Sequence, residues 1–409
     1  MKDKINLAVI GLGQRGFGLL SGVLVKQNDI NIVGLCDIYE DRLARANNTV
    51  KEAKDIETFT TTDYRAIFDI KNLDAVLVST AWEYHLEITV YALKKGVPTA
   101  MEVGGAYSEQ ELWDLVKTYE QTKTPFMFME NCCYNKSEMM AVNMAEQGLF
   151  GTVVHASGSY SHDLREEISG GDINRHYRLR NYLSRNCDNY PTHDIGPIAK
   201  LLNVNRGNKF VSLVSVSSKS AGLEEYINAR KDKYPELVGK RFAQGDIVNT
   251  IITCAHGETV SLKLDTTLPR FYARDFTVMG TKGFYEQNAN LVYLESEQQT
   301  EEYDTVKSYK RLIDNGARYE NYLPEAWRKV TEEQLSSGHG GMDYFEFREF
   351  IECLKNGNEM PIDVYDAATW MVISILSEQS IAKGSSPIVF PDFTCGKWLI
   401  RKPMDLISF

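Results

Sequence analysis

Apolar residues in the first 130 positions form short continuous runs, and these runs alternate with segments of helical period. The runs lie at residues 5–10, 30–37, 73–80, 97–103 and 125–131. Continuous apolar runs are typical of strands buried on both faces of a parallel sheet. Between them, residues 85–96 and 108–123 have the period of amphipathic helices, and Ser108 and Glu111 have capping-box spacing. The pattern predicts an α/β region over 1–130, an N-terminal Rossmann domain with a doubly wound parallel sheet.

From about residue 150 the pattern changes to alternation of polar and apolar residues. Segments 152–163, 209–220, 246–268 and 274–295 alternate in this way and are separated by turn residues. They predict a large, mostly antiparallel sheet. Helical periods at 191–203, 340–357 and 363–384 predict helices that cover one face of it. We therefore expect residues 131–409 to form a C-terminal α+β domain for substrate binding and oligomerisation, with residues 296–337 as a surface excursion.

The glycines after the first run have the spacing of a dinucleotide-binding loop. Gly11 permits the tight turn, Gly13 lets the backbone approach a pyrophosphate, and Gly16 allows close helix packing. Asp37 ends the second run, where a carboxylate binds the ribose 2′-hydroxyl and repels a 2′-phosphate. The combination predicts NAD as the cofactor. Thr80, Glu102 and Glu130 end later runs and are expected to face the ligand crevice.

Composition and charge narrow the classes of partner. The net charge of -11 argues against nucleic acid and anionic membranes as partners. The chain has no apolar stretch long enough to span a bilayer, and its first residues leave no room for an export signal, so we expect a cytoplasmic protein. The seven cysteines lack metal-ligand spacing and are expected to be buried free thiols. No metal site is predicted, and His155, His162, His176 and His256 are expected to be structural or surface residues.

Several motifs together resemble the glucose-fructose oxidoreductase, inositol dehydrogenase and rhizopine-catabolism superfamily. They are VIGLGQRG, STAWEYH, AMEVGGA, ENCCY, YPTHDIGPIAKLLNVNRG and HGGMDYFEFREFIECL. Within that superfamily the chain most resembles the NAD-dependent glycosidases of glycoside hydrolase family 109, whose described activity is α-N-acetylgalactosaminidase. The resemblance runs from residue 5 to about residue 394. ENCCY and the YPTH segment are its specific parts.

Two positions separate the chain from the ordinary sugar dehydrogenases of the superfamily. Those enzymes usually have Glu-Lys-Pro where this chain has Glu102-Val103-Gly104, so the lysine that assists hydride transfer is missing. They also have a histidine after the Asp-x-Gly motif, whereas His193 precedes Asp194 here. Both differences resemble the glycosidase branch. Gly104 and Asp194 themselves depart from that branch, which often has Pro and Gly there.

The resemblance implies two sets of site residues. The cofactor set comprises Gln14, Arg15, Asp37, Trp82, His85, Glu102, Val103 and Asn131, together with the glycines of the loop. The sugar set comprises Tyr160, Arg178, Tyr190, Pro191, Thr192, His193 and Tyr272, and Glu130 is a further candidate for contact with a substrate hydroxyl.

The chemistry implied by the resemblance is hydrolysis through transient oxidation. A hydride leaves C3 of the sugar, the C2 proton is removed, the group at C1 is eliminated, water adds, and the hydride returns. His193 is the candidate acceptor of the hydroxyl proton and Tyr160 the candidate for the C2 proton, although these roles could be exchanged. Arg178 would favour a phenolate at Tyr160.

Other interpretations remain open at this point. His193 could cap the following helix, and Tyr160 could be a packed aromatic residue. A sugar or cyclitol dehydrogenase with net NADH formation is the alternative activity, and a non-catalytic NAD or sugar sensor is a third class. A two-carboxylate glycosidase would use Glu130 and Asp163, but the spacing of these residues does not support it. We expect a small carbohydrate or glycoside as substrate and a homo-oligomer, either a dimer or a tetramer.

Overall fold

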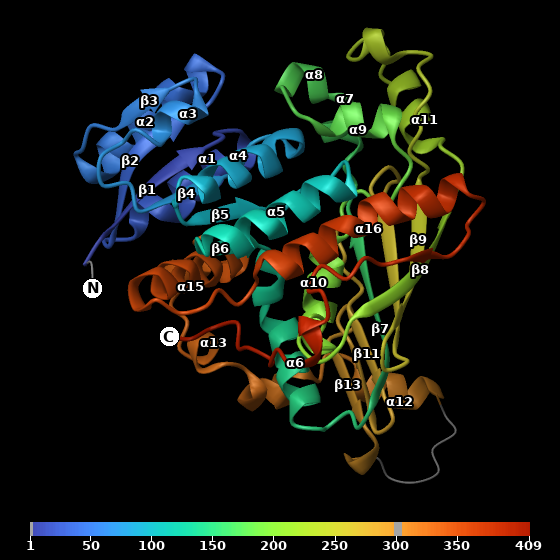
Figure 1. The fold of residues 1–409 in the computed structure, drawn as a ribbon. Coiled ribbons are helices and arrows are strands. Elements are labelled where there is room, and N and C mark those ends of the chain that lie inside the picture. Colours follow the sequence, from blue (N-terminus) through green and yellow to red (C-terminus); the bar gives the residue numbers. More distant parts are fainter. Residues whose placement is uncertain (1–2, 298–304) are drawn as a thin grey trace. The chain divides into compact units, whose positions relative to one another are not determined.

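The computed structural model describes residues 3–297 and 305–409, which fold as two compact units (Figure 1). Unit 1 contains the chain up to Tyr134 and two later segments, Lys329–Ala368 and Met404–Phe409. Unit 2 contains Asn135–Arg328 and Thr369–Pro403. The two later segments of unit 1 pack with a nucleotide-binding region from which they are far removed in sequence.

Unit 1 is built on a six-stranded sheet of order β3-β2-β1-β4-β5-β6 in which every neighbouring pair is parallel. The strands are β1 (Ile5–Ile10), β2 (Ile30–Cys36), β3 (Phe59–Thr61), β4 (Ala75–Val78), β5 (Thr99–Glu102) and β6 (Phe126–Met129). All residues of β4, β5 and β6 are buried, as the continuous apolar runs predict. The reversal of strand order beside β1 is the switch point at which such sheets bind ligands.

Helices follow the strands of unit 1 in the predicted alternation. They are α1 (Gln14–Gly22), α2 (Glu40–Lys54), α3 (Tyr64–Ile67), α4 (Trp82–Lys94), α5 (Glu109–Thr122), α14 (Glu332–Leu335) and α15 (Met342–Asn356). The capping box of Ser108 and Glu111 starts α5 as predicted. Helix α15 corrects the prediction that segment 340–357 covers the second sheet. It belongs to unit 1, where Arg348 and Lys355 form ion pairs with Asp29.

Unit 2 contains an eight-stranded sheet of order β13-β12-β11-β7-β10-β9-β8-β14 (Figure 1). Its strands are β7 (Val153–Ser161), β8 (Phe210–Ser217), β9 (Ile247–Cys254), β10 (Thr259–Asp265), β11 (Thr277–Gly280), β12 (Gly283–Glu286), β13 (Leu291–Leu294) and β14 (Ile388–Val389). Only the pairing of β7 with β10 is parallel among these strands. The mostly antiparallel sheet is therefore confirmed.

The helices of unit 2 include the two that the sequence assigned to its sheet. They are α6 (Lys136–Glu146), α7 (Arg165–Ser169), α8 (Gly171–Asn174), α9 (Arg178–Ser184), α10 (Thr192–Leu201), α11 (Gly222–Asn228), α12 (Thr305–Leu312), α13 (Glu325–Arg328) and the larger part of α16 (Val364–Ala382). Helix α10 packs on β7 so closely that a Cβ at Gly158 would lie 2.8 Å from that of Asp194. This packing brings the start of α10 beside the carboxyl end of β7.

The segment predicted as a surface excursion is more ordered than its sequence suggested. Residues 298–304 lie outside the described part of the chain, but the rest of 296–337 contains α12, α13 and α14. Leu312, Tyr319, Leu323 and Trp327 are buried there. These apolar residues have no regular spacing, because the segment is a series of short helices.

Two expectations from the composition can be compared with the described residues. Six of the seven cysteines are buried free thiols, whereas Cys395 is exposed, which corrects the prediction for that one residue. None of the described helices combines the length and apolar character needed to cross a bilayer.

Candidate functional site

The glycine loop of unit 1 has the shape that the dinucleotide fingerprint predicts. Gly11 has φ +98°, and a Cβ on it would lie 2.5 Å from the backbone of Ser79. A Cβ on Gly16 would lie 2.0 Å from the carbonyl oxygen of Gly11. A Cβ on Gly13 would instead meet only the Arg42 guanidinium, at 3.5 Å. The backbone at Gly13 and the N-terminus of α1, which begins at Gln14, are therefore open to a phosphate.

Asp37 follows β2 and closes the loop from the other side. Its Oδ2 accepts a hydrogen bond of 2.7 Å from the backbone N–H of Leu12, and its Oδ1 accepts one of 3.0 Å from Tyr39. Arg42 Nη1 lies 3.8 Å from Oδ2. The carboxylate is thus fixed beside the phosphate loop, where the fingerprint places the ribose of the adenosine half.

Trp82 and His85 lie on the first turn of α4, directly after the carboxyl end of β4. Both are buried, and burial lowers the pKa of His85 to about 4. The ring is therefore neutral at physiological pH, and its Nε2–H donates to the carbonyl oxygen of Thr80 at 2.9 Å. A Cβ on Gly104 would lie 2.6 Å from His85 Nδ1, so the chain after β5 passes directly over this ring.

Arg15 connects the glycine loop to two carboxylates. Its Nε donates to Glu102 Oε1 at 2.8 Å, and its two Nη atoms donate to Asp343 at 2.8 and 3.1 Å. Burial acts to lower the pKa of Arg15, but Glu102 and Asp343 outweigh it and raise the pKa. The same arginine, with His339, holds the pKa of Asp343 well below its usual range in spite of burial. The side chain of Arg15 thus ties the glycine loop to Glu102 and Asp343.

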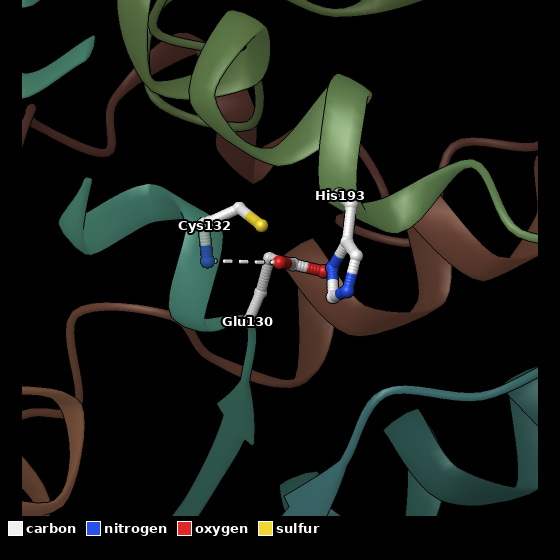
Figure 2. Close-up of side chains that lie close together, drawn as sticks. All are labelled: Glu130, Cys132 and His193. Carbon is white, nitrogen blue, oxygen red and sulfur yellow. Dashed lines mark hydrogen bonds between the residues drawn. The ribbon is translucent and has the colours of Figure 1, made fainter. Parts of the chain in front are cut away.

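The segments after β5 and β6 carry Val103, Glu130 and Asn131 at the carboxyl edge of the sheet of unit 1. Val103, after β5, donates its N–H to Glu102 Oε2 at 3.3 Å. Glu130 is fully buried and accepts a hydrogen bond of 3.1 Å from the backbone N–H of Cys132 (Figure 2). The amide of Asn131 donates to Asp343 Oδ1 at 2.8 Å. All of the residues assigned to the cofactor therefore lie at the carboxyl edge of the sheet or on the helices that follow it.

In unit 2 three predicted residues form one aromatic group. Tyr160 lies near the end of β7, and its ring centroid is 4.6 Å from that of Tyr190 and 5.4 Å from that of His193. The rings of Tyr190 and His193 are 4.7 Å apart. His193 is the second residue of α10 (Figure 2). The cap position is Pro191, which makes no side-chain capping bond. The alternative of His193 as a helix cap is therefore wrong.

Arg178 places a positive charge against this aromatic group. It is the first residue of α9, it is buried, and its guanidinium carbon lies 4.7 Å from the centroid of the Tyr190 ring. Its Nε forms an ion pair of 2.7 Å with Glu167 Oε1. Burial acts to lower the pKa of Arg178, but Tyr177, Tyr160 and Glu167 raise it well above its usual value. The arginine stays cationic and stabilises negative charge on the nearby phenols.

Tyr272 and His162 extend the same group. The rings of His162 and Tyr272 lie 5.2 Å apart, and those of His162 and Tyr160 lie 6.1 Å apart. The loop that carries Tyr272 is held against β7 by two hydrogen bonds between the backbones of Ser161 and Ala273. Tyr272 is 51% exposed and so lies at the open side of the group. Pro191 and Thr192 are buried at the start of α10 and bring Tyr190 and His193 together.

Several residues that sequence reasoning missed support these groups. Asp343, His339 and Glu346 belong to unit 1, and their HGGMDYFE segment was noted only as part of a resemblance. In unit 2 the buried pair Arg274 and Glu138 lies at 2.5 Å, and Arg274 donates to the backbone carbonyl of His193 at 3.5 Å. His162 was expected to be a structural or surface residue, and its half-buried ring contacts two of the predicted sugar residues.

Two protein-family models match successive parts of the chain. The NAD-binding Rossmann fold of an oxidoreductase family matches residues 5–129, and the C-terminal domain of glycosyl hydrolase family 109 matches residues 134–400. A levoglucosan dehydrogenase, solved with NADH and levoglucosan, has a TM-score of 0.70 at 18% identity, over 95% of this chain and 100% of its own. That similarity supports the fold class.

Two curated relatives are similar along nearly the whole chain. A glycosyl hydrolase family 109 protein of Stenotrophomonas maltophilia is 37% identical, over 98% of this chain and 91% of its own length. An α-N-acetylgalactosaminidase of Tannerella forsythia is 34% identical, over 98% of this chain and 88% of its own length. The fold, the two family matches and these relatives define an NAD-dependent enzyme of the oxidoreductase superfamily predicted above. Within it, the chain belongs to glycosyl hydrolase family 109.

Proposed function

We propose that the protein is an NAD-dependent glycosidase, similar to α-N-acetylgalactosaminidase, that cleaves its substrate through transient oxidation at C3. The observation that carries this proposal is the contact between Tyr160 and His193, whose ring centroids lie 5.4 Å apart beside the buried Arg178. The reaction removes protons from neighbouring positions of one sugar ring, so it needs two proton acceptors close together. Unit 2 supplies them from β7 and α10.

Unit 1 fits NAD as the recycled cofactor. The open backbone at Gly13, the N-terminus of α1 and the fixed carboxylate of Asp37 suit a pyrophosphate and an unphosphorylated ribose. When bound, NAD accepts the hydride from C3 of the sugar and returns it at the end of the cycle. Glu102, Val103, Asn131, Trp82 and His85 would hold its nicotinamide half, because they follow the strands on the other side of the switch point from Asp37.

The residues of unit 2 would move the protons. His193 accepts the proton of the C3 hydroxyl during the oxidation and returns it during the reduction. Tyr160, as a phenolate stabilised by Arg178, removes the C2 proton that the neighbouring ketone has made acidic. Loss of that proton expels the group at C1, and water then adds to the unsaturated ring. The hydride and both protons are returned, so the net reaction is hydrolysis.

Substrate contacts would come from the remaining polar side chains of each group. Tyr190, Arg178 and the exposed Tyr272 would bind sugar hydroxyls or the C2 substituent, since aromatic rings and cations are typical of carbohydrate sites. Pro191 and Thr192 hold the turn that orients them. Glu130 would accept a hydrogen bond from a substrate hydroxyl.

The test is hydrolysis of a panel of aryl α- and β-glycosides that includes the α-N-acetylgalactosaminide, with absorbance at 340 nm recorded in parallel. We expect aglycone to be released with no net NADH, and incubation in D₂O to place deuterium at C2 of the product. Stoichiometric NADH from a free sugar with no glycoside cleaved would support a sugar or cyclitol dehydrogenase instead.

Variants at the two acceptors give a sharper test. Tyr160→Phe and His193→Ala should each lower kcat by about 10²- to 10⁴-fold, the range of general acid–base catalysis. Tyr182→Phe is a matched control, because Tyr182 is also buried in unit 2 and its hydroxyl forms hydrogen bonds with Thr266 and Asn189. If all three variants behave alike, the acceptor assignment is wrong.

We also propose that the chain forms a homo-oligomer through the outward face of the eight-stranded sheet. Helix α10 covers the opposite face, at Gly158. The outward face exposes Val216 (52%), Ile251 (47%), Met279 and Tyr293 on four different strands. Apolar residues spread over a flat sheet are typical of a subunit interface. Light scattering should give a dimer or tetramer mass, and Ile251→Lys should reduce it to that of the monomer.

A further inference from the structure

Glu346 lies near the start of α15 with no solvent exposure. Neither of its carboxyl oxygens has a hydrogen-bond partner among the described residues. A buried carboxylate without partners costs several kcal/mol, whereas a protonated carboxyl costs much less. The buried environment of Glu346 therefore favours the protonated form of its carboxyl group over the ionised form.

Charged and titratable groups on several elements of unit 1 act on Glu346. They are Glu102 at the end of β5, Glu130 directly after β6, Tyr134 in the turn Asn131–Tyr134, Asp343 on α15 and Arg15 on α1. Burial first, and then Glu102, Asp343 and Glu130, raise the pKa of Glu346 well above its usual value, while Arg15 acts in the opposite direction. Four carboxyl groups thus share one arginine, and that arginine is already paired with two of them.

The cluster lies on the side of the sheet where the nicotinamide half of a dinucleotide belongs. Asp37 after β2 marks the adenosine half, so the second half lies over the ends of β4, β5 and β6. Glu102 is the last residue of β5, and Glu130 directly follows β6. An oxidised nicotinamide ring is cationic and a reduced one is neutral. A cationic ring beside the cluster favours ionisation of a protonated carboxyl group, whereas a neutral ring does not.

We propose that Glu346 is a positioning residue that exchanges a proton with the redox state of the cofactor, being ionised beside the oxidised ring and protonated beside the reduced one. The step balances as follows: the hydride of the C3–H bond goes to the nicotinamide, the hydroxyl proton goes to His193, and Glu346 takes one further proton from solvent to replace the lost positive charge. The summed charge of the cofactor and the carboxyl cluster therefore does not change on reduction. Glu346 releases its proton to solvent when the hydride returns, so a complete redox-neutral cycle exchanges no net protons with solvent.

The test measures the affinities of the apoprotein for NAD⁺ and NADH from about pH 5.5 to about pH 9, by calorimetry and NADH fluorescence. In the native protein the preference for NAD⁺ over NADH should rise with pH by up to about tenfold per unit, because one more proton is lost on binding NAD⁺. In Glu346→Gln, which cannot ionise, the ratio should be flat. This outcome depends on cofactor binding alone, so it is separate from any failure of the glycosidase proposal.

Glu349→Gln is the matched control. Glu349 is buried on the same helix, but it accepts hydrogen bonds from Ser408 and Cys353. We expect its pH slope to equal that of the native protein. A flat ratio in the native protein, or a slope that survives in Glu346→Gln, would overturn the proposal. If Glu346→Gln does not fold, infrared difference spectra of the native protein decide: the NADH complex must gain a protonated carboxyl band over the NAD⁺ complex.

Discussion

The carboxylate of Asp343 accepts two hydrogen bonds from the guanidinium of Arg15, although 328 residues separate them in the chain. Arg15 belongs to the glycine loop, and Asp343 is on the first turn of α15. A Cβ on Gly338 would lie 2.4 Å from Asp343 Oδ2, so the Gly-His-Gly-Gly turn wraps tightly around this carboxylate. The late segment of the chain therefore completes the cofactor region of unit 1.

Asp343→Asn should weaken both folding and cofactor retention. The substitution removes the charge that Arg15 pairs with, and breaking a buried pair costs roughly 3 kcal/mol. Since Asn131 and His339 also bind this carboxylate, the loop, the turn and Asn131 should all lose order. We expect a lower melting temperature and at least tenfold faster release of NAD, measured by dilution of the loaded protein.

Asp29→Asn is the control variant, because it should lower the stability of unit 1 without changing the residues around the cofactor. Asp29 pairs with Arg348 and Lys355 of the same helix, but it directly precedes β2 and so lies at the amino edge of the sheet. We expect lower stability with an NAD release rate within about twofold of the native rate. Equal release rates in both variants would show that helix docking, rather than the Arg15 contact, controls retention.

Gly104→Ala should disturb the cofactor region by steric means. The new Cβ would lie 2.6 Å from His85 Nδ1 and 2.9 Å from Trp82, both of them buried. One side must shift, so we expect about tenfold weaker NAD binding by titration calorimetry. Gly18→Ala on α1 is the matched control, because nothing lies within 4 Å of its Cβ. It should keep the native affinity and gain up to about 1 kcal/mol of stability.

Most of unit 1 could be predicted because parallel strands buried on both faces leave continuous apolar runs. The predicted strands, the helix after Ser108 and the glycine loop are all confirmed. The packing of α15 could not be predicted in this way. The helical period of its apolar residues indicates that one face of α15 is buried, but it does not specify which of the two sheets covers that face. A signal was present in Arg348 and Lys355, but their partner Asp29 is more than 300 residues away.

The sequence predicted which residues belong to the candidate site, but only part of their contacts with one another. Tyr190 and His193 are three residues apart, so their contact follows from a single turn and the start of α10. Their contact with Tyr160 depends on how α10 packs on β7, which the glycine at position 158 permits. Glu346 was missed because it reads as an ordinary polar position of an amphipathic helix, and its burial depends on long-range packing.

Arg178→Lys should impair catalysis even though it keeps the charge. A guanidinium stacks on a ring and pairs with a carboxylate at the same time, as Arg178 does with Tyr190 and Glu167, whereas an ammonium is a compact and strongly hydrated charge. We expect kcat to fall at least tenfold and the ascending limb of the pH profile, which reports ionisation of Tyr160 to its active phenolate, to move to higher pH. Arg180→Lys, at an exposed position of the same helix, should leave the pH profile unchanged. Identical profiles for both variants would contradict a role for Arg178.

Asp188 should make the stability of unit 2 depend on pH in a direction opposite to that of a paired carboxylate. It lies two residues before Tyr190, and burial raises its pKa to about 7, although Thr250 acts to lower it. An aspartate in the unfolded chain has a pKa of 3.8, so between these two pKa values the folded state binds the proton more tightly. The protonated Asp188 therefore contributes its full stabilisation below pH 3.8, the pKa in the unfolded chain. This contribution is lost as the pH rises to about 7, the pKa in the folded protein.

Asp188→Asn cannot ionise and should remove this loss. Other groups titrate alike in both proteins and cancel in the difference, so the stability gain of the variant should grow from about pH 4 to about pH 7 and then stay level. At the plateau we expect about 1–3 kcal/mol, the cost of a poorly satisfied buried carboxylate. Denaturant unfolding at several pH values measures it, with Asp172→Asn, at an exposed position, as the control expected to show no trend. A gain that does not change with pH would mean that Asp188 is already ionised throughout, held by partners that offset its burial.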